Sequence, residues 1–184
     1  MGHIEFLVGK NAPISSDLPA LIALLEDKST LFLVRWNNND HERAGAVSQA
    51  AMPLLDSIAN ELLREKVERN GLSTYSSSAF AAHMNTVCGK GVSGISLSDQ
   101  KAMVASGPGA GVIAPHLGTC TSLTLDRLLN KIKHRNPRLM NFRIEHGRHI
   151  FLICPELTSG GAEGIYEFDI LEFCAHCQAA AQAL

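Results

Sequence analysis

Three residues in the C-terminal half of the sequence have the types and the order of a nucleophilic triad, namely Cys120, His149 and Asp169. A thiol becomes a nucleophile when a helix N-terminus and a nearby imidazolium both favour the thiolate. His149 precedes the apolar residues 150–153, which are typical of a strand, so a rigid element would hold this base. Asp169 lies between two apolar residues, where a carboxylate is otherwise out of place. We therefore expect its carboxylate to orient the imidazole.

The expected environment of Cys120 depends on a helix that the sequence predicts immediately after it. Thr119 or Thr121 can cap this helix, and leucines at helical spacing continue as far as Ile132. Asn-Pro at 136–137 ends the pattern. Cys120 would then lie at the helix N-terminus, where the dipole activates a thiol.

The same residues resemble a known enzyme family. Gly118 to Leu129 is similar to the Gly-x-Cys-x-x-Leu-Ser/Thr segment that begins the nucleophile helix of YopT/AvrPphB-type effector cysteine proteases. His149 at the start of a strand resembles the histidine of that family, and Phe-Asp at 168–169 before a terminal helix resembles its aspartate segment. The resemblance covers about residues 115–184. It implies a papain-like fold and a protein substrate, such as a host protein.

Within this thiol chemistry several assignments stay open. His146 could replace His149 as the base, and Cys88 is a competing nucleophile, although it is predicted to end a helix. The oxyanion donor is unassigned, with His116 and Asn85 as candidates beside the N–H of the nucleophile. A protease and a glutamine deamidase share the same acyl-enzyme chemistry, so the sequence does not separate them.

A second cysteine pair has the spacing of a zinc or redox motif. Cys174 and Cys177 form a C-x-x-C pair that Cys154, with His146 or His149, could complete as a zinc site. On a helix the pair would share one face, which equally predicts packing against a sheet. We therefore expect no required cofactor. The alternative to an enzyme is a non-catalytic interaction protein such as a chaperone, immunity protein or adaptor, with or without a structural zinc site.

Composition limits the other function classes. The chain has 184 residues, 46% of them hydrophobic and 18% charged, with a formal net charge of −2, as expected for one globular domain. The densest basic stretch, residues 131–135, has no aromatic platform, so nucleic acid is not an expected partner.

Localisation is bounded by the cysteines and by the first residues. The five cysteines are odd in number and irregularly spaced, which predicts free thiols in a reducing compartment. The sequence begins without a basic and then apolar signal, and a membrane span is not expected. A cytoplasmic protein is predicted, or one secreted by a non-Sec route into a host cell.

Hydrophobic spacing and turn residues predict an α+β fold in one domain. Residues 1–111 should be mostly helical, whereas residues 112–184 should form one helix and an antiparallel sheet that carries the triad. The expected helices cover 18–25, about 53–67 with a stop at Gly71, 79–87, 99–105 with a Ser98 cap, and 172–184. The expected strands cover 30–36, 139–145, 149–154 and 165–171, with a turn at Gly147 and a break at 89–91.

Overall fold

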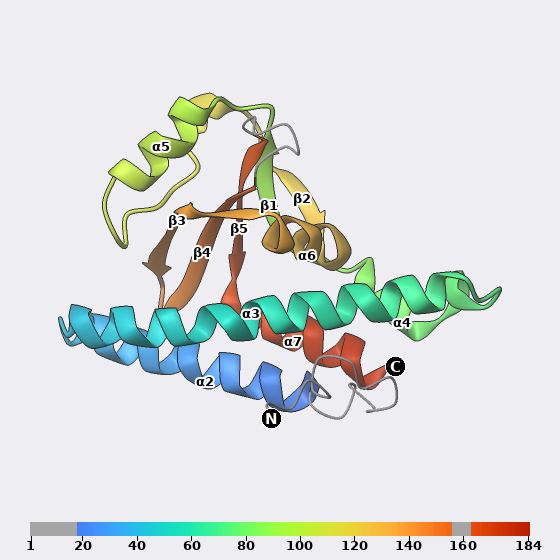
Figure 1. Cartoon of the computed structure of the whole chain (residues 1–184). Coiled ribbons are helices and arrows are strands. Elements are labelled where there is room, and N and C mark those ends of the chain that lie inside the picture. Colours follow the sequence, from blue (N-terminus) through green and yellow to red (C-terminus); the bar gives the residue numbers. More distant parts are fainter. Residues whose placement is uncertain (1–17, 156–162) are drawn as a thin grey trace, which may run out of the picture.

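The computed structural model describes residues 18–155 and 163–184, which form an α+β fold around a five-stranded antiparallel sheet. Most of the helices cover one face of this sheet, and the strand order is β2-β1-β5-β4-β3 (Figure 1). The elements in chain order are α2 (Leu18–Asn37), α3 (His41–Asn70), η2 (Tyr75–Ser77), α4 (Ala79–Met84), β1 (Val87–Ser93), α5 (Leu97–Ala105), η3 (Pro115–Leu117), β2 (Thr121–Thr124), α6 (Leu125–Lys133), β3 (Arg135–Glu145), β4 (Arg148–Pro155), β5 (Gly164–Asp169) and α7 (Ile170–Gln182). The predicted α+β class, with N-terminal helices and an antiparallel sheet, is thus confirmed.

Two long helices, α2 and α3, form a hairpin that packs with α7 beneath the sheet (Figure 1). The strand predicted over residues 30–36 is wrong, because α2 continues through these residues to Asn37. The buried residues of α2 recur every three or four positions as far as Phe32, and this helical period outweighs the local β-propensity. α3 begins earlier than predicted, with Asp40 as its N-cap and Pro53 inside the helix, and ends at Gly71 as expected.

The predicted break at residues 89–91 is also wrong, because these residues lie in β1, which pairs with both β2 and β5. A side chain at Gly91 would overlap the ring of Tyr166 on β5, so glycine permits this close approach rather than ending the strand. In the following helix, α5, the N-cap is Ser96 in place of the predicted Ser98.

The helix expected to begin at Cys120 starts later. Residues 121–124 form β2, which pairs with β1, and α6 begins at Leu125. Thr124 is the N-cap, since its hydroxyl accepts a hydrogen bond from the backbone N–H of Arg127. Cys120 therefore precedes a strand and lacks the helix N-terminus that the sequence pattern predicted.

The three strands and the terminal helix predicted between residues 139 and 184 are largely confirmed. β3 and β4 form a hairpin whose turn residues, His146 and Gly147, both have positive φ values of 52° and 78°. β5 ends two residues earlier than predicted because the side chain of Asp169 accepts hydrogen bonds from the N–H groups of Leu171 and Glu172. Asp169 thereby becomes the N-cap of α7.

Alternation along the strands gives the sheet two different faces. The first, which packs on α2, α3, α6 and α7, includes Phe151, Ile153 and Phe168 in the larger hydrophobic cluster. The second is divided into two parts. Near α5 it is covered and apolar, with Leu152 and Ile165 in a smaller cluster, whereas the remainder is an open and charged groove.

Candidate functional site

The structure separates the cysteine and the histidine of the predicted triad. Cys120 precedes β2 and His149 is near the start of β4, and the strand order places two strands between them. Since β2 and β4 run in opposite directions, their starting ends lie at opposite ends of the sheet. Strand spacing and rise place the two residues about 20 Å apart.

His149 lies on the helix-covered face. Its Nδ1 is 3.0 Å from the hydroxyl of Ser29 on α2, and its ring stacks on Phe32 with centroids 4.5 Å apart. Burial lowers the pKa of His149 to about 4, although the charge of Asp169 acts in the opposite direction. The imidazole is therefore neutral and held against the helical layer.

Asp169 lies on the opposite face of the sheet, as the register shows. It pairs directly with Ile150, so its side chain projects on the face that His149 avoids. One carboxylate oxygen caps α7, and the other accepts a 2.7 Å hydrogen bond from Nε of Arg148. The carboxylate of Asp169 is thus engaged with a cation and a helix N-terminus.

The residues left open as alternative base, nucleophile and oxyanion donor lie in different parts of the fold. His146 is exposed in the β3–β4 turn, and Cys88 lies at 2% exposure where burial raises the pKa of its thiol to about 12. Asn85 ends α4 and donates to the carbonyl of Ala81, and His116 lies in η3. The structure brings His146 and Cys88 to one groove, but Cys88 remains a protonated thiol at neutral pH.

The other cysteines are mostly buried. Cys174 and Cys177 pack in the larger core cluster with Cys88, whereas Cys154 belongs to the smaller cluster on the other face. Burial raises the pKa of Cys154 and Cys174 to about 12 and raises that of Cys177 as well. In residues 18–155 and 163–184 no group of three or more His, Cys, Asp or Glu side chains is arranged to hold a metal.

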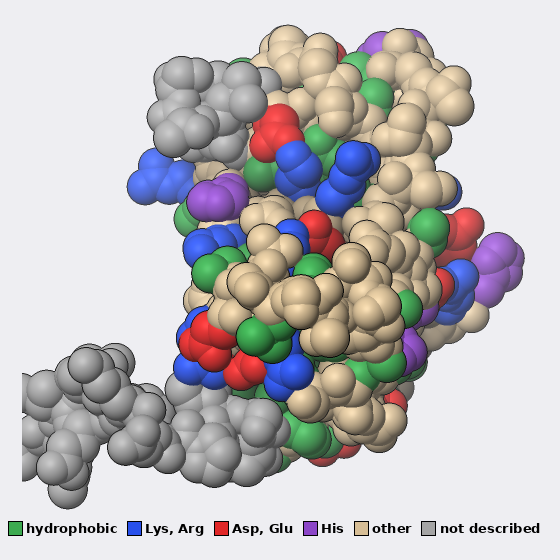
Figure 2. Space-filling model, turned by 90° about the vertical axis from the view of Figure 1, so that its right-hand side faces the viewer, with side chains coloured by type: hydrophobic (Ala, Val, Ile, Leu, Met, Phe, Trp, Pro, Cys, Tyr) green, Lys and Arg blue, Asp and Glu red, His purple; other side chains and the backbone are tan. Residues whose placement is uncertain are grey.

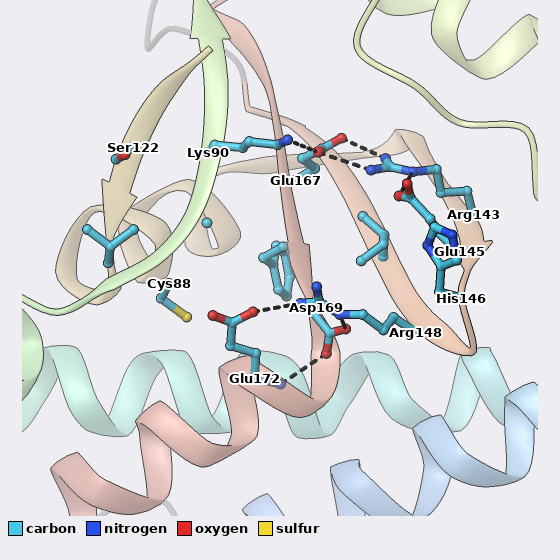
Figure 3. A pocket seen from close by; sticks show the side chains of 14 residues that line it. Cys88, Lys90, Ser122, Arg143, Glu145, His146, Arg148, Glu167, Asp169 and Glu172 are labelled. Carbon is cyan, nitrogen blue, oxygen red and sulfur yellow. Dashed lines mark hydrogen bonds and ion pairs between the residues drawn. The ribbon is translucent and has the colours of Figure 1, made fainter.

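The open groove is a concave feature of this sheet face with many charged lining residues and a volume of about 450 Å³ (Figure 3). Four side chains of alternating charge form a row across it (Figure 3). The row consists of Lys90 on β1, Glu167 on β5, and Arg143 and Glu145 on β3. We call these four residues the charged row.

Short contacts hold the charged row together. Arg143 reaches over β4 and binds both oxygens of Glu167, at 2.7 and 3.1 Å. Lys90 approaches the same carboxylate at 3.3 Å, and Nε of Arg143 donates to Glu145 at 3.0 Å. The two central side chains are 7% and 18% exposed, whereas Lys90 and Glu145 at the ends are 59% and 49% exposed.

Electrostatic interactions keep the two central residues of the row, Glu167 and Arg143, ionised. Burial alone would raise the pKa of Glu167, but hydrogen bonds and charge from Arg143 and Lys90 hold it below the usual range. The hydrogen bonds from Arg143 to Glu167 raise the pKa of the guanidinium in return. Glu167 is therefore an ionised, fully engaged carboxylate and not a proton donor at neutral pH.

A second ion-pair cluster lies beside the row. Arg148, 56% exposed, binds Asp169 through Nε and Glu172 through Nη2, the latter at 2.8 Å. This cluster joins the start of β4 to the first turn of α7. The groove thus contains two paired networks, with Ser122 of β2 along its other side (Figure 3).

The sequence contained a signal for this groove that the triad hypothesis did not use. Charged residues alternate with apolar ones in Arg143-Ile144-Glu145 and in Glu167-Phe168-Asp169. This alternation predicts strands whose charged sides share one face. Which strands become neighbours is a long-range property, and it could not be obtained from the local pattern.

Comparisons add no assignment, because searches of protein-family models, curated proteins and solved structures found no match to this chain.

On the face shown in Figure 2, acidic and basic side chains are interspersed, with no extended basic surface of the kind that nucleic acids select. No helix in the described part of the chain is long and apolar enough to cross a membrane.

Proposed function

We propose that this chain is a non-catalytic interaction protein that binds a segment of a partner protein in the open groove. The observation that carries the proposal is the charged row, in which buried ionised side chains lie on an uncovered sheet face. Burying charged groups is costly, so paired charges on an open concave face are more typical of a recognition surface than of core packing.

The chemistry of the groove supports binding rather than turnover. Its buried carboxylate Glu167 is held as an anion by Arg143 and Lys90, and Cys88, the one thiol among its described lining residues, has a pKa raised to about 12. Catalytic acids and nucleophiles need protonation states that change near the working pH. Fixed charges instead supply orientation and specificity toward a charged partner.

The thiol hydrolase with Cys120, His149 and Asp169 stays a hypothesis that rests on the sequence resemblance. A papain-like active site needs the cysteine at a helix N-terminus next to the imidazole. Here Cys120 precedes a strand, and His149 is bound to Ser29 on the covered face. A large rearrangement would be required to join them, so we rank this function second.

The proposal can be tested by selecting random twelve-residue peptides on immobilised full-length protein. The selected peptides are then titrated into wild type, the double variant Lys90→Gln with Glu145→Gln, and Cys120→Ser. We expect the double variant to bind about tenfold more weakly, since it loses the two exposed charges of the charged row. The variant Cys120→Ser should bind as wild type does.

A matched control is the double variant Lys101→Gln with Asp27→Asn, which removes the same two charges from exposed positions on α5 and α2. Binding should be unaffected by it. The proposal fails if no selected peptide depends on the groove. It also fails if mass spectrometry shows cleavage or deamidation of the peptides by wild type but not by Cys120→Ser.

A further inference from the structure

We infer that the groove selects an extended partner segment carrying one acidic and one basic residue four positions apart. This inference rests on the proposed function and specifies its partner. It follows from the order of charges in the row, from which of them are exposed, and from the length of the row.

The two ends of the charged row are where a partner can make contact. Glu167 and Arg143 in the middle are mostly buried and use their hydrogen-bonding atoms on each other. Lys90 at one end makes an ion pair with Glu167 and is 59% exposed, so its remaining N–H groups face solvent. Glu145 at the other end has one oxygen bound to Arg143 and is 49% exposed.

The ends have opposite charges, which determines the chemistry of the occupant. An acidic side chain of the partner fits beside Lys90, where the hydroxyl of Ser122, directly opposite on β2, adds a second donor. A basic side chain fits beside Glu145. A segment of one charge sign would be repelled at one end of the row, so a mixed-charge segment is preferred.

The length of the row sets an upper limit on the spacing between the two partner residues. The contacts from Lys90 to Glu167, then to Arg143 and to Glu145 are 3.3, 2.7 and 3.0 Å long. With the widths of one carboxylate and one guanidinium included, the end charges are at most about 14 Å apart. In an extended chain, residues four apart lie on one side and are separated by about 13 Å.

The matching probes are end-blocked nine-residue peptides built from Thr and Val, with Asp and Lys placed two, three or four positions apart. They are titrated into isotope-labelled full-length protein, with the amide signals of Gly89 and Gly91 on β1 reporting groove occupancy by NMR. We expect the four-residue spacing to bind about threefold more tightly than the two-residue spacing. The three-residue spacing, which puts the charges on opposite sides, should bind most weakly.

A charge reversal supplies the decisive comparison. The variant Glu145→Lys should prefer a peptide with Asp at both positions over the Asp and Lys peptide, which inverts the preference of wild type. The control Asp27→Lys makes an equal change of charge on α2 and should leave the wild-type order unchanged. A protein that is merely destabilised would lose affinity for all peptides alike.

The outcomes separate this inference from the proposed function. If selected peptides depend on the groove but the defined peptides show no preference for spacing, the inference is wrong and the function stands. If Glu145→Lys leaves the preference unchanged, the inference is also wrong. If no peptide of either kind depends on Lys90 and Glu145, both fail.

Discussion

The two faces of the β4–β5 strand pair treat their polar residues in opposite ways. His149 projects toward the helices and has a pKa lowered to about 4, with a serine hydroxyl as its hydrogen-bond partner. Its neighbour Arg148 projects into the groove and remains charged against Asp169 and Glu172. The comparison shows that burial neutralises a group without a counter-charge, whereas paired groups stay ionised. Apolar packing should therefore dominate stability on the covered face.

The largest loss of stability is expected from a core substitution on the covered face. Phe168→Ala should lower the free energy of unfolding by about 4 kcal/mol, because the ring is 2% exposed and packs against Phe151 and Phe173. Urea unfolding followed by circular dichroism measures the change. Val87→Ala on β1, where the side chain is 53% exposed, is the control and should cost less than about 0.5 kcal/mol. A cost below about 1 kcal/mol for Phe168→Ala would contradict the assigned core.

The next effect is a pH dependence caused by His149. Its pKa is about 4 in the folded chain and near 6.5 in the unfolded chain, so only the unfolded chain binds this proton between those values. Stability should fall as pH decreases from about 6.5 to 4, by roughly 3 kcal/mol in total. The free energy of unfolding, measured at a series of pH values, tests this prediction.

The variant His149→Phe isolates the contribution of the histidine. An aromatic ring of similar shape can stack on Phe32, and Ser29 can turn its hydroxyl to a carbonyl of its own helix. Other titrating groups remain, among them Glu167, whose lowered pKa acts at lower pH. Subtracting the two profiles should leave the slope between pH 6.5 and 4. Parallel profiles would show that His149 is not buried as described.

A smaller loss of stability is expected from the open face. Arg143→Ala removes the bidentate partner of Glu167 and leaves that carboxylate with Lys90 alone. Since water reaches the groove, the cost should be about 2 kcal/mol, less than for a fully buried pair. Arg138→Ala, an exposed change on the same strand, should be nearly neutral. Equal costs for the two variants would place Arg143 at the surface.

The smallest loss of stability is expected from a substitution at the N-terminus of α6. Thr124→Ala should cost about 1 kcal/mol, because its hydroxyl caps the first turn by accepting from Arg127. Thr121→Ala should cost less, since residue 121 lies in β2 and not at a helix start. Thermal unfolding of both variants makes the comparison. A larger loss at Thr121 would restore the helix that the sequence pattern predicted after Cys120.

Sequence reasoning succeeded where short-range patterns determine structure. The β3–β4 hairpin could be predicted because alternating residues flank a glycine turn, and the terminal helix because its apolar spacing is regular. It failed at residues 30–36, where β-branched and aromatic residues continue a helix whose burial period begins at Leu18. It also failed at Gly91, since the close approach of Tyr166 depends on a strand 75 residues later.

The candidate site shows the same contrast between short-range patterns and long-range strand pairing. Cys120, His149 and Asp169 have the order of a triad, but order along the chain does not determine the face or the end of a sheet. A change of one residue in position along a strand moves a side chain to the other face. The charged row was visible only as alternation within single strands, and its assembly required the pairing order of four strands.

The most direct test of the central claim is the rate of iodoacetamide labelling at each cysteine, measured by mass spectrometry at pH 7.5 in wild type and in His149→Phe. Cys120 should label first, because it is partly exposed whereas the other four cysteines are buried. Its rate should be the same in both proteins, since the two residues lie on distant parts of the sheet. A severalfold slower rate in His149→Phe would contradict this account and support the thiol enzyme.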